Sequence, residues 1–185
     1  MGLFGLGKKK DSAAPSANDK ISLQGGSKSV DTLKCILTAG LRNVDIEVNL
    51  SDDDAGPELT HGSFSTSGEQ AITTYLDFKG QGTSFKPKKA RHLGNQNCWM
   101  ELASTQLDKG EQVSAILNRM NAVLGEQEYL AGPLSLAEAH VGASVYCIKS
   151  MGNYPQGLGN IDTWLSRIEG KIAEPLRARY LAYTS

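Results

Sequence analysis

Residues 44–50, VDIEVNL, alternate apolar and polar side chains without interruption. Successive side chains of a β-strand point to opposite faces, so this pattern predicts a strand with one buried face. Before it, apolar residues between Val30 and Leu41 recur at helical spacing, and Ile21–Gln24 can form a short strand that ends at Gly25-Gly26. Strand, helix and strand within about 30 residues favour a right-handed βαβ unit with two parallel strands.

A short hairpin and one more helix are expected next. Pro57–Thr60 and Ser63–Ser65 can pair as antiparallel strands around a turn at His61-Gly62. The apolar positions from Ala71 to Leu76 share one helical face, so they predict a helix. The G-Q-G sequence within residues 80–86 neither follows a strand nor opens a helix, so we interpret this segment as a linker rather than a phosphate-binding loop.

The pattern from Pro87 onward is helical throughout. Pro87 suits the first position of a helix, and two helices are predicted at about 88–107 and 111–126. Residues 136–148, LAEAHVGASVYCI, are nearly apolar all round, which is typical of a helix buried at the centre of a bundle. A last amphipathic helix carries Ile161, Trp164, Leu165 and Ile168. Pro175 should kink or break the chain after it.

Composition excludes several classes of function. The chain has 185 residues, 39% of them hydrophobic, and a formal net charge of -1. It is large enough for a packed core, and neither its charge nor any basic stripe points to nucleic acid. No run reaches the roughly 18 apolar residues that a membrane span needs, and residues 1–7, MGLFGLG, are too short and glycine-rich for a secretory signal. We therefore expect a soluble intracellular protein without a membrane span.

Residues 1–20 combine small residues, one proline and the lysine run Lys8–Lys10, so they cannot bury enough apolar area to offset their ordering entropy. We interpret them as a flexible basic tail. Leu3, Phe4 and Leu6 precede the lysines, which gives a short apolar tip beside a basic cluster. Two hypotheses stay open for this tail: it docks the protein onto a larger assembly, or it is an idle solubilising segment.

The cysteines and histidines are scattered along the chain. Cys35, Cys98 and Cys147 form no C-x-x-C pair and lie among apolar neighbours in predicted helices, so we expect reduced core thiols. His61, His92 and His140 form no cluster with the spacing of a zinc or iron site. The sequence therefore predicts no metal.

A capping box opens the apolar helix at 136–148. Ser135 and Glu138 are spaced so that each side chain can bond the other residue's backbone N–H. Together with this box, the stretch Glu128–Glu138, EYLAGPLSLAE, resembles the helical-domain signature of the cytosolic glutathione transferases. Trp164 and Ile168 are similar to the late W-x-x-x-I pattern of the same family.

The resemblance covers about residues 21–183 and implies an α+β thioredoxin-like N-terminal domain followed by an all-α helical bundle. The thioredoxin-like domain is expected at residues 21–79, the linker at 80–86 and the helical domain at 87–185.

The same resemblance implies a glutathione site. Pro57 matches the family's cis-proline, whose neighbouring backbone, here Gly56, pairs with the cysteinyl part of glutathione. Gly68-Glu69 stand where the family carries an acidic residue and a serine. Ser29 matches the serine or cysteine that begins the first helix, where N–H groups and the helix dipole can stabilise a thiolate. The simpler interpretation is that Ser29 only caps a peripheral helix, whereas Ser135 caps the central one.

Three departures from the family weaken this site. Glu69 offers a carboxylate where the family's serine donates to the γ-glutamyl carboxylate of glutathione. Only SDDDAG separates Leu50 from Pro57, which leaves no room for the helix that contacts the far end of the ligand. Asp52, Asp53 and Asp54 add negative charge near a site for an anion. We therefore expect glutathione to bind weakly or not at all, and no other cofactor.

Two functions stay open. The first is a non-catalytic or weakly catalytic interaction module with protein partners in a larger assembly, a role of similar domains in translation-factor and synthetase complexes. The second is a glutathione-dependent transferase or peroxidase in which Ser29 activates the thiol. Family members commonly dimerise through the first two long helices, so a homodimer is an expectation from the family.

Overall fold

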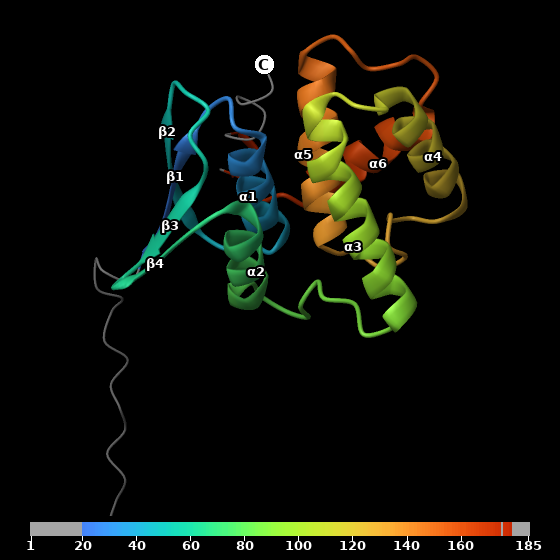
Figure 1. Cartoon of the computed structure of the whole chain (residues 1–185). Coiled ribbons are helices and arrows are strands. Elements are labelled where there is room, and N and C mark those ends of the chain that lie inside the picture. Colours follow the sequence, from blue (N-terminus) through green and yellow to red (C-terminus); the bar gives the residue numbers. More distant parts are fainter. Residues whose placement is uncertain (1–19, 175, 179–185) are drawn as a thin grey trace, which may run out of the picture.

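The computed structural model describes residues 20–174 and 176–178, so Pro175 and nearly all of the predicted tail lie outside the described residues. The N-terminal part contains β1 (Ile21–Gly26), α1 (Val30–Leu41), β2 (Ile46–Ser51), β3 (Glu58–His61), β4 (Phe64–Ser67) and α2 (Glu69–Lys79). The C-terminal part contains α3 (Ala90–Thr105), the 3-10 turn η2 (Leu107–Lys109), α4 (Val113–Glu126), α5 (Leu136–Ser150) and α6 (Gly159–Glu169). A thioredoxin-like domain followed by a helical bundle is therefore confirmed (Figure 1).

The sheet has the strand order β2-β1-β3-β4, with β1 parallel to β2 and antiparallel to β3. Helix α1 connects the parallel pair, which confirms the predicted βαβ unit. Strand β1 runs through Gly25-Gly26 instead of ending there, because both glycines pair with the last residues of β2. In the β3–β4 hairpin His61 pairs with Phe64, so the turn lies at Gly62-Ser63 and not at His61-Gly62.

All described helices lie on one side of the sheet (Figure 1). Helices α1 and α2 pack against each other, and α1 also packs against α5 of the bundle. The apolar side chains of both domains form one continuous core cluster. Helix α5 is buried on almost every side from Leu136 to Tyr146, as its apolar sequence predicts.

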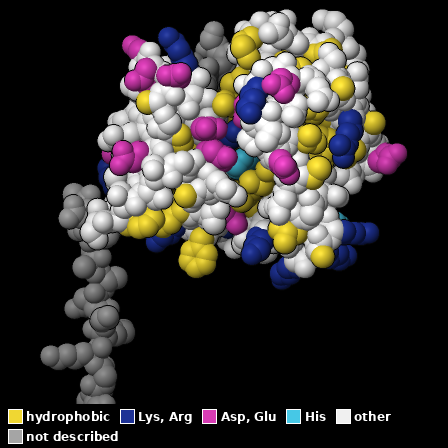
Figure 2. Space-filling model, viewed as in Figure 1, with side chains coloured by type: hydrophobic (Ala, Val, Ile, Leu, Met, Phe, Trp, Pro, Cys, Tyr) yellow, Lys and Arg dark blue, Asp and Glu magenta, His cyan; other side chains and the backbone are white. Residues whose placement is uncertain are grey.

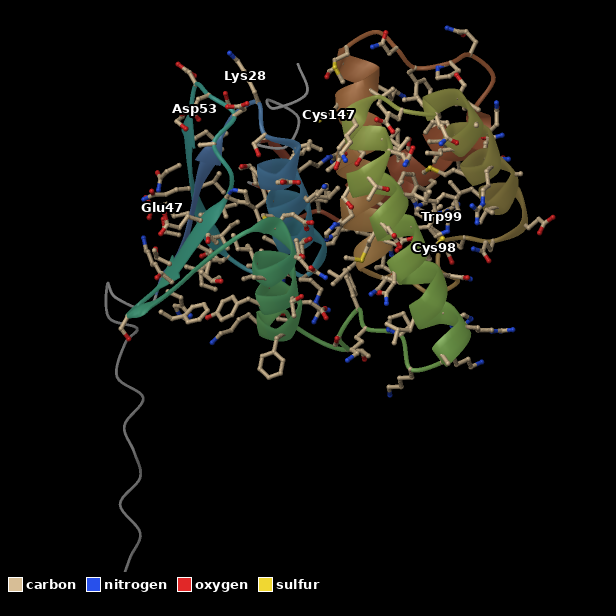
Figure 3. The ribbon with its side chains drawn as sticks, in the orientation of Figure 1. Lys28, Glu47, Asp53, Cys98, Trp99 and Cys147 are labelled. Atoms are coloured by element: carbon tan, nitrogen blue, oxygen red, sulfur yellow. The ribbon has the colours of Figure 1, made fainter. Side chains whose placement is uncertain are left out.

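The opposite face of the sheet is polar. Strand register places side chains of all four strands on this face, and every one of them is polar: Ser22, Gln24, Glu47, Asn49, Glu58, Thr60, Ser65 and Ser67. Glu47 accordingly points away from the helices (Figure 3). A polar face can stay hydrated, so the sequence itself is adapted to a sheet that no described helix covers on this side.

Three details of the helical part differ from expectation. Helix α3 begins at Ala90, with Lys89 in the extended N-cap conformation, so Pro87 precedes the helix rather than opening it. Leu107 belongs to η2 and not to α3. Cys98 is exposed on α3, whereas Cys35 is buried and Cys147 half-buried, so the prediction of three core thiols is wrong for Cys98. None of the helices in the described ranges is long and apolar enough to cross a membrane.

Candidate functional site

Ser29 lies at the N-terminus of α1, where it is the N-cap residue. Its backbone is extended, with φ −84° and ψ 113°, and its Oγ accepts a hydrogen bond from the Thr32 backbone N–H at 3.3 Å. The residue is only 8% exposed. These contacts are those of a helix cap, and they turn the hydroxyl toward the backbone of α1.

The segment that leads into α1, residues 26–28, is joined to the β2–β3 loop by backbone hydrogen bonds. The N–H groups of Gly26, Ser27 and Lys28 donate to carbonyl groups of Ala55, Ser51 and Asp53 over distances of 2.8 to 3.1 Å. A Cβ atom on Gly26 would lie 2.3 Å from the Asp53 carbonyl oxygen, so the close approach of these two segments requires glycine. The loop at residues 52–57 therefore holds the segment before α1 in place through these hydrogen bonds, and it contains no helix.

The β2–β3 loop also meets the start of α2. The Gly68 N–H donates to the Pro57 carbonyl oxygen at 3.2 Å, and Gly68 has φ 86° as the N-cap residue of α2. Gly56 is exposed, with open space around its Cα. The structure therefore places Pro57, with Gly56 before it, next to the start of α2 at Gly68.

Asp52, Asp53 and Asp54 are exposed at the loop tip. The Asp53 carboxylate accepts from the Ser51 hydroxyl at 2.7 Å and from the Ala55 N–H at 3.1 Å. These hydrogen bonds, with a smaller contribution from the Lys28 charge, lower the pKa of Asp53. Lys28 and Asp53 lie at the same end of the sheet (Figure 3).

Glu69, the first residue of α2, faces the buried His140 of α5. Glu69 Oε2 lies 3.4 Å from His140 Nδ1, and His140 Nε2 lies 3.2 Å from Thr73 Oγ1. Burial lowers the pKa of His140 to about 3, and the Lys34 charge acts in the same direction. Burial raises the pKa of Glu69. The Glu69–His140 contact therefore joins a neutral imidazole to a carboxyl group and is not an ion pair at neutral pH.

A fully buried lysine ties α1 to the helical domain. Lys34 Nζ lies 2.6 Å from Asp108 Oδ2 and 2.9 Å from Asp31 Oδ1, and Asp108 also accepts from the Ser144 hydroxyl at 2.6 Å. Burial opposes the charged form of Lys34, but the carboxylates of Asp108 and Asp31 outweigh burial and raise its pKa. This charged network sits between the two domains.

A pocket of about 440 Å³ opens beside the N-terminus of α1. We call it the α1 pocket; its lining includes Ser27, Lys28, Val30, Asp108, Ser144 and Cys147. Lys28 on the β1–α1 loop and Cys147 on α5 flank it from the two domains (Figure 3). Burial raises the pKa of the Cys147 thiol to about 11, so at neutral pH this pocket presents a thiol and not a reactive thiolate. Within the described ranges, no group of three or more His, Cys, Asp or Glu residues could hold a metal ion.

The sequence analysis names Ser29, Gly56, Pro57, Gly68 and Glu69 as candidates, and it does not name the buried polar groups at the contact between the two domains. Lys34, Asp108, Ser144 and His140 come together only when α1, α2, η2 and α5 pack. A lysine and a histidine within otherwise apolar helical faces were the available signal, because such groups are rarely buried without partners. The sequence does not say which partners they find.

No protein-family model and no curated protein sequence matches this chain. Its fold, however, matches solved structures over most of its length. A theta class glutathione S-transferase from Xanthomonas axonopodis pv. citri, solved with glutathione bound, has a TM-score of 0.68 at 17% identity, over 87% of this chain and 96% of that one. A delta-class glutathione transferase from Nilaparvata lugens has a TM-score of 0.69 at 19% identity, over 88% and 99%. FzlA from C. crescentus has a TM-score of 0.71 at 12% identity, over 88% and 92%.

At such identities the matches establish the fold. The chain has the fold of the glutathione transferases, as its sequence predicts.

Proposed function

We propose that this glutathione-transferase-like protein is a non-catalytic or weakly catalytic interaction module that binds glutathione poorly. The observation that carries the proposal is the carboxyl group of Glu69 at the first residue of α2. In the family, a serine at this place donates to the γ-glutamyl carboxylate of glutathione. Two carboxylates at contact distance repel by on the order of a few kcal/mol at an effective dielectric near 20, and partial exposure reduces that figure.

Two further features support poor glutathione binding. Asp52, Asp53 and Asp54 are exposed on the β2–β3 loop and repel an anion such as glutathione. The segment 52–57 is a loop braced against the start of α1 and supplies no helix to hold the far end of the ligand.

Features of the surface support an interaction role. The outer face of the sheet carries only polar side chains, and it is flanked by the exposed carboxylates of Asp52, Asp53 and Asp54. No described helix covers this face, so it is accessible, and its hydrated side chains keep the sheet stable without a partner. The tail of residues 1–20 is a second candidate contact with a partner, and its Lys8–Lys10 carry positive charge where Asp52–Asp54 carry negative charge.

The α1 pocket favours a second candidate function, a glutathione-dependent transferase or peroxidase. It lies beside Ser29 and combines Val30 and Ile148 with polar groups such as Ser27, which suits a small amphipathic substrate. In that case the N-terminus of α1 would stabilise the thiolate of glutathione.

Calorimetric titration with reduced glutathione tests the first proposal. We expect no saturable binding below about 1 mM, because the carboxylate of Glu69 and the missing helix both oppose it. A micromolar dissociation constant would overturn the proposal. Turnover with a model electrophile that disappears in Ser29→Ala, with folding intact, would establish the transferase instead.

A variant pair isolates the contribution of Glu69. Glu69→Ser should strengthen glutathione binding, because it removes the like charge and restores a hydroxyl donor at the start of α2. Glu47→Ser makes the same change on the outer face of the sheet, away from α2, and should leave binding unchanged. Equal effects of the two variants would mean that only net charge matters.

A further inference from the structure

The segment that links α2 to α3 concentrates positive charge. Between Asp77 and Glu101 the sequence contains no acidic residue, although the whole chain has a formal net charge of -1. The cations of this stretch are all exposed: Lys79, Lys86, Lys88, Lys89 and Arg91. Together with Phe78 we call them the linker edge. Figure 2 shows Lys and Arg side chains along the lower side of the molecule, where Figure 1 shows the linker between α2 and α3.

The cations of the linker edge have no acidic partners among the described residues. The ion pairs of the described ranges are all formed by other cations. Lys79 Nζ lies 5.6 Å from the centroid of the Tyr75 ring, and Arg91 Nε donates to His92 Nε2 at 3.1 Å. Desolvation, followed by the charges of Arg91 and Lys89, lowers the pKa of His92. The linker edge therefore presents a positive potential that nearby carboxylates do not neutralise.

Buried contacts hold the backbone of the linker in place. The Asp77 carboxylate accepts from the Ser84 hydroxyl at 2.6 Å and from the Phe85 N–H at 2.8 Å. Arg42 Nε lies 2.9 Å from the same carboxylate, and Arg42 Nη1 donates to the Thr83 carbonyl oxygen at 2.9 Å. The Arg42 guanidinium also lies over the Phe85 ring, 4.7 Å from its centroid. Because these contacts fix the linker on its inner side, its lysines are presented to solvent in a preorganised arrangement.

Phe78 adds an apolar group to this positive surface. It is 87% exposed, more than any other large hydrophobic side chain in the described ranges. Its neighbours Leu76 and Asp77 on α2 are buried, so Phe78 lies on the solvent side of the last turn. A single exposed apolar side chain is common on protein surfaces, but this one is followed directly by Lys79 and by the lysines of the linker. An aromatic ring beside several cations is typical of a surface that binds the headgroup region of a membrane.

The tail of residues 1–20 joins the fold next to the linker edge. Lys20, the first described residue, lines a pocket of about 600 Å³ together with Lys79. The tail carries Lys8–Lys10 and the apolar tip that precedes them. Asp45 and Glu47 line the same pocket, so the positive surface extends from there toward α3 and not toward β2. Two segments that combine lysines with apolar side chains therefore emerge at one side of the molecule.

We propose that the linker edge binds an anionic lipid bilayer. The lysines pair with acidic headgroups, and each lysine near an anionic surface strengthens binding by roughly fivefold. Phe78 inserts its ring at the boundary between headgroups and acyl chains. A bilayer yields around a projecting ring, whereas an acidic protein would need a preformed pocket that matches Phe78. Membrane binding also becomes firm only when two weak signals act together, and the linker edge and the tail provide two.

This inference goes beyond the proposed function and uses other residues. The glutathione titration tests Glu69 at the start of α2, whereas the linker edge begins at the end of that helix. Failure of either result leaves the other standing.

The test is co-sedimentation of the full chain with lipid vesicles. We expect saturable binding to vesicles of phosphatidylcholine and phosphatidylserine in equal parts, no binding to pure phosphatidylcholine, and weaker binding as salt is raised. Soluble polyglutamate represents an acidic protein partner. Binding to polyglutamate without binding to the anionic vesicles would overturn the proposal in favour of such a partner, and equal binding to both kinds of vesicle would overturn it as well.

A matched pair of variants separates the linker edge from a general effect of charge. Lys88→Gln/Lys89→Gln should weaken binding to the anionic vesicles by roughly 20-fold, since it removes two lysines next to the start of α3. Lys28→Gln/Lys109→Gln makes the same change in net charge away from the linker, because Lys28 precedes α1 and Lys109 follows the far end of α3. This control should bind as the wild type does. Equal losses in the two variants would contradict a specific surface.

The role of Phe78 is tested by fluorescence. In Phe78→Trp the new indole should shift its emission to shorter wavelength on anionic vesicles and be quenched by brominated acyl chains, while the native Trp99 and Trp164 are buried and give a constant background. Phe78→Ala should weaken vesicle binding several-fold, and Met151→Ala, which shortens an exposed side chain at the end of α5, should not. An unchanged emission of Phe78→Trp on bound vesicles would show that the ring does not insert. All substituted side chains are exposed, so the variants should fold.

Discussion

Two serines of this chain have the same role but differ in their surroundings. Ser29 caps α1, and Ser135 caps α5. The expectation that α1 is peripheral is wrong, because α1 is buried from Thr32 to Leu41, between the sheet and α5. The difference between the caps comes from Glu138 instead. Its fully buried carboxyl group accepts from the Ser135 N–H at 2.8 Å, the Ser135 hydroxyl at 2.9 Å and the Leu130 N–H at 2.7 Å.

We predict that Ser135→Ala destabilises the fold more than Ser29→Ala. Loss of the Ser135 cap should cost about 1–2 kcal/mol, because it also takes a donor from the buried Glu138, and loss of the Ser29 cap about 0.5–1 kcal/mol. Denaturant unfolding of both variants measures the difference. Equal midpoints with unchanged slopes would contradict the prediction.

The buried His140 makes stability depend on pH. Its pKa falls from 6.5 to about 3 on folding, so below pH 6.5 the unfolded chain binds a proton that the folded chain excludes. The stabilisation is complete above pH 6.5 and is lost as the pH falls toward 3, by up to about 1.4 kcal/mol per pH unit. We predict that unfolding free energies of wild type and His140→Gln converge as the pH is lowered from 7 to 5. Parallel pH profiles would show that His140 does not titrate on unfolding.

Glu138 and Glu69 can also contribute to the pH dependence of the unfolding free energy, so their effects must be separated from that of His140. Burial raises the pKa of Glu138 to about 7, so its effect has the opposite sign: stability falls as the pH rises from 4.5 toward 7. Glu138 is present in both chains, and its contribution cancels in the difference. Glu69 touches the same imidazole, so the comparison should be repeated in a Glu69→Gln background, where the convergence should persist.

At the scale of elements, the packing of α1 on the helical domain includes the buried charge of Lys34. We predict that Lys34→Met destabilises the protein by about 3–5 kcal/mol, because it leaves the largely buried Asp108 without its cation. Denaturant unfolding gives the loss directly.

The double variant Lys34→Met/Asp108→Leu is the control for that prediction. Replacing both members of a buried ion pair by apolar groups is often close to neutral, so the double variant should recover much of the lost stability. If it is as unstable as Lys34→Met alone, the cost comes from packing and not from an unpaired carboxylate.

At the scale of the whole molecule, the core is built from Ile21 onward among the described residues. We predict that deleting residues 1–20 leaves the thermal midpoint unchanged and reduces co-purification of partners. Changing Lys8–Lys10 to alanine should give a smaller loss that depends on salt, since exposed charges are screened. A truncated protein that keeps all partners at the same stoichiometry would mean that the tail is idle.

The sequence by itself determined the elements of this fold. The alternation at residues 44–50, the helical spacing of α1 and α6, and the capping box of Ser135 and Glu138 all depend on neighbours within a few positions. Such local patterns carry enough information because one pleat, one helical turn or one cap is a short-range structure. Pro57 and Gly68 flank the β3–β4 hairpin, so their hydrogen bond also belongs to a local structure.

Only the tertiary structure decided which polar groups are buried together. Lys34 and Asp108 are 74 positions apart, and His140 meets Thr73 across 67 positions. Their contacts depend on how helices of two domains pack, and no local period encodes that geometry. The sequence identifies Glu69 only as the first residue of a helix, and the same packing places its side chain in the wall of a pocket between α2 and α3. A partly buried carboxyl group needs hydrogen-bond partners, and the packing of the helices decides which ones lie within reach.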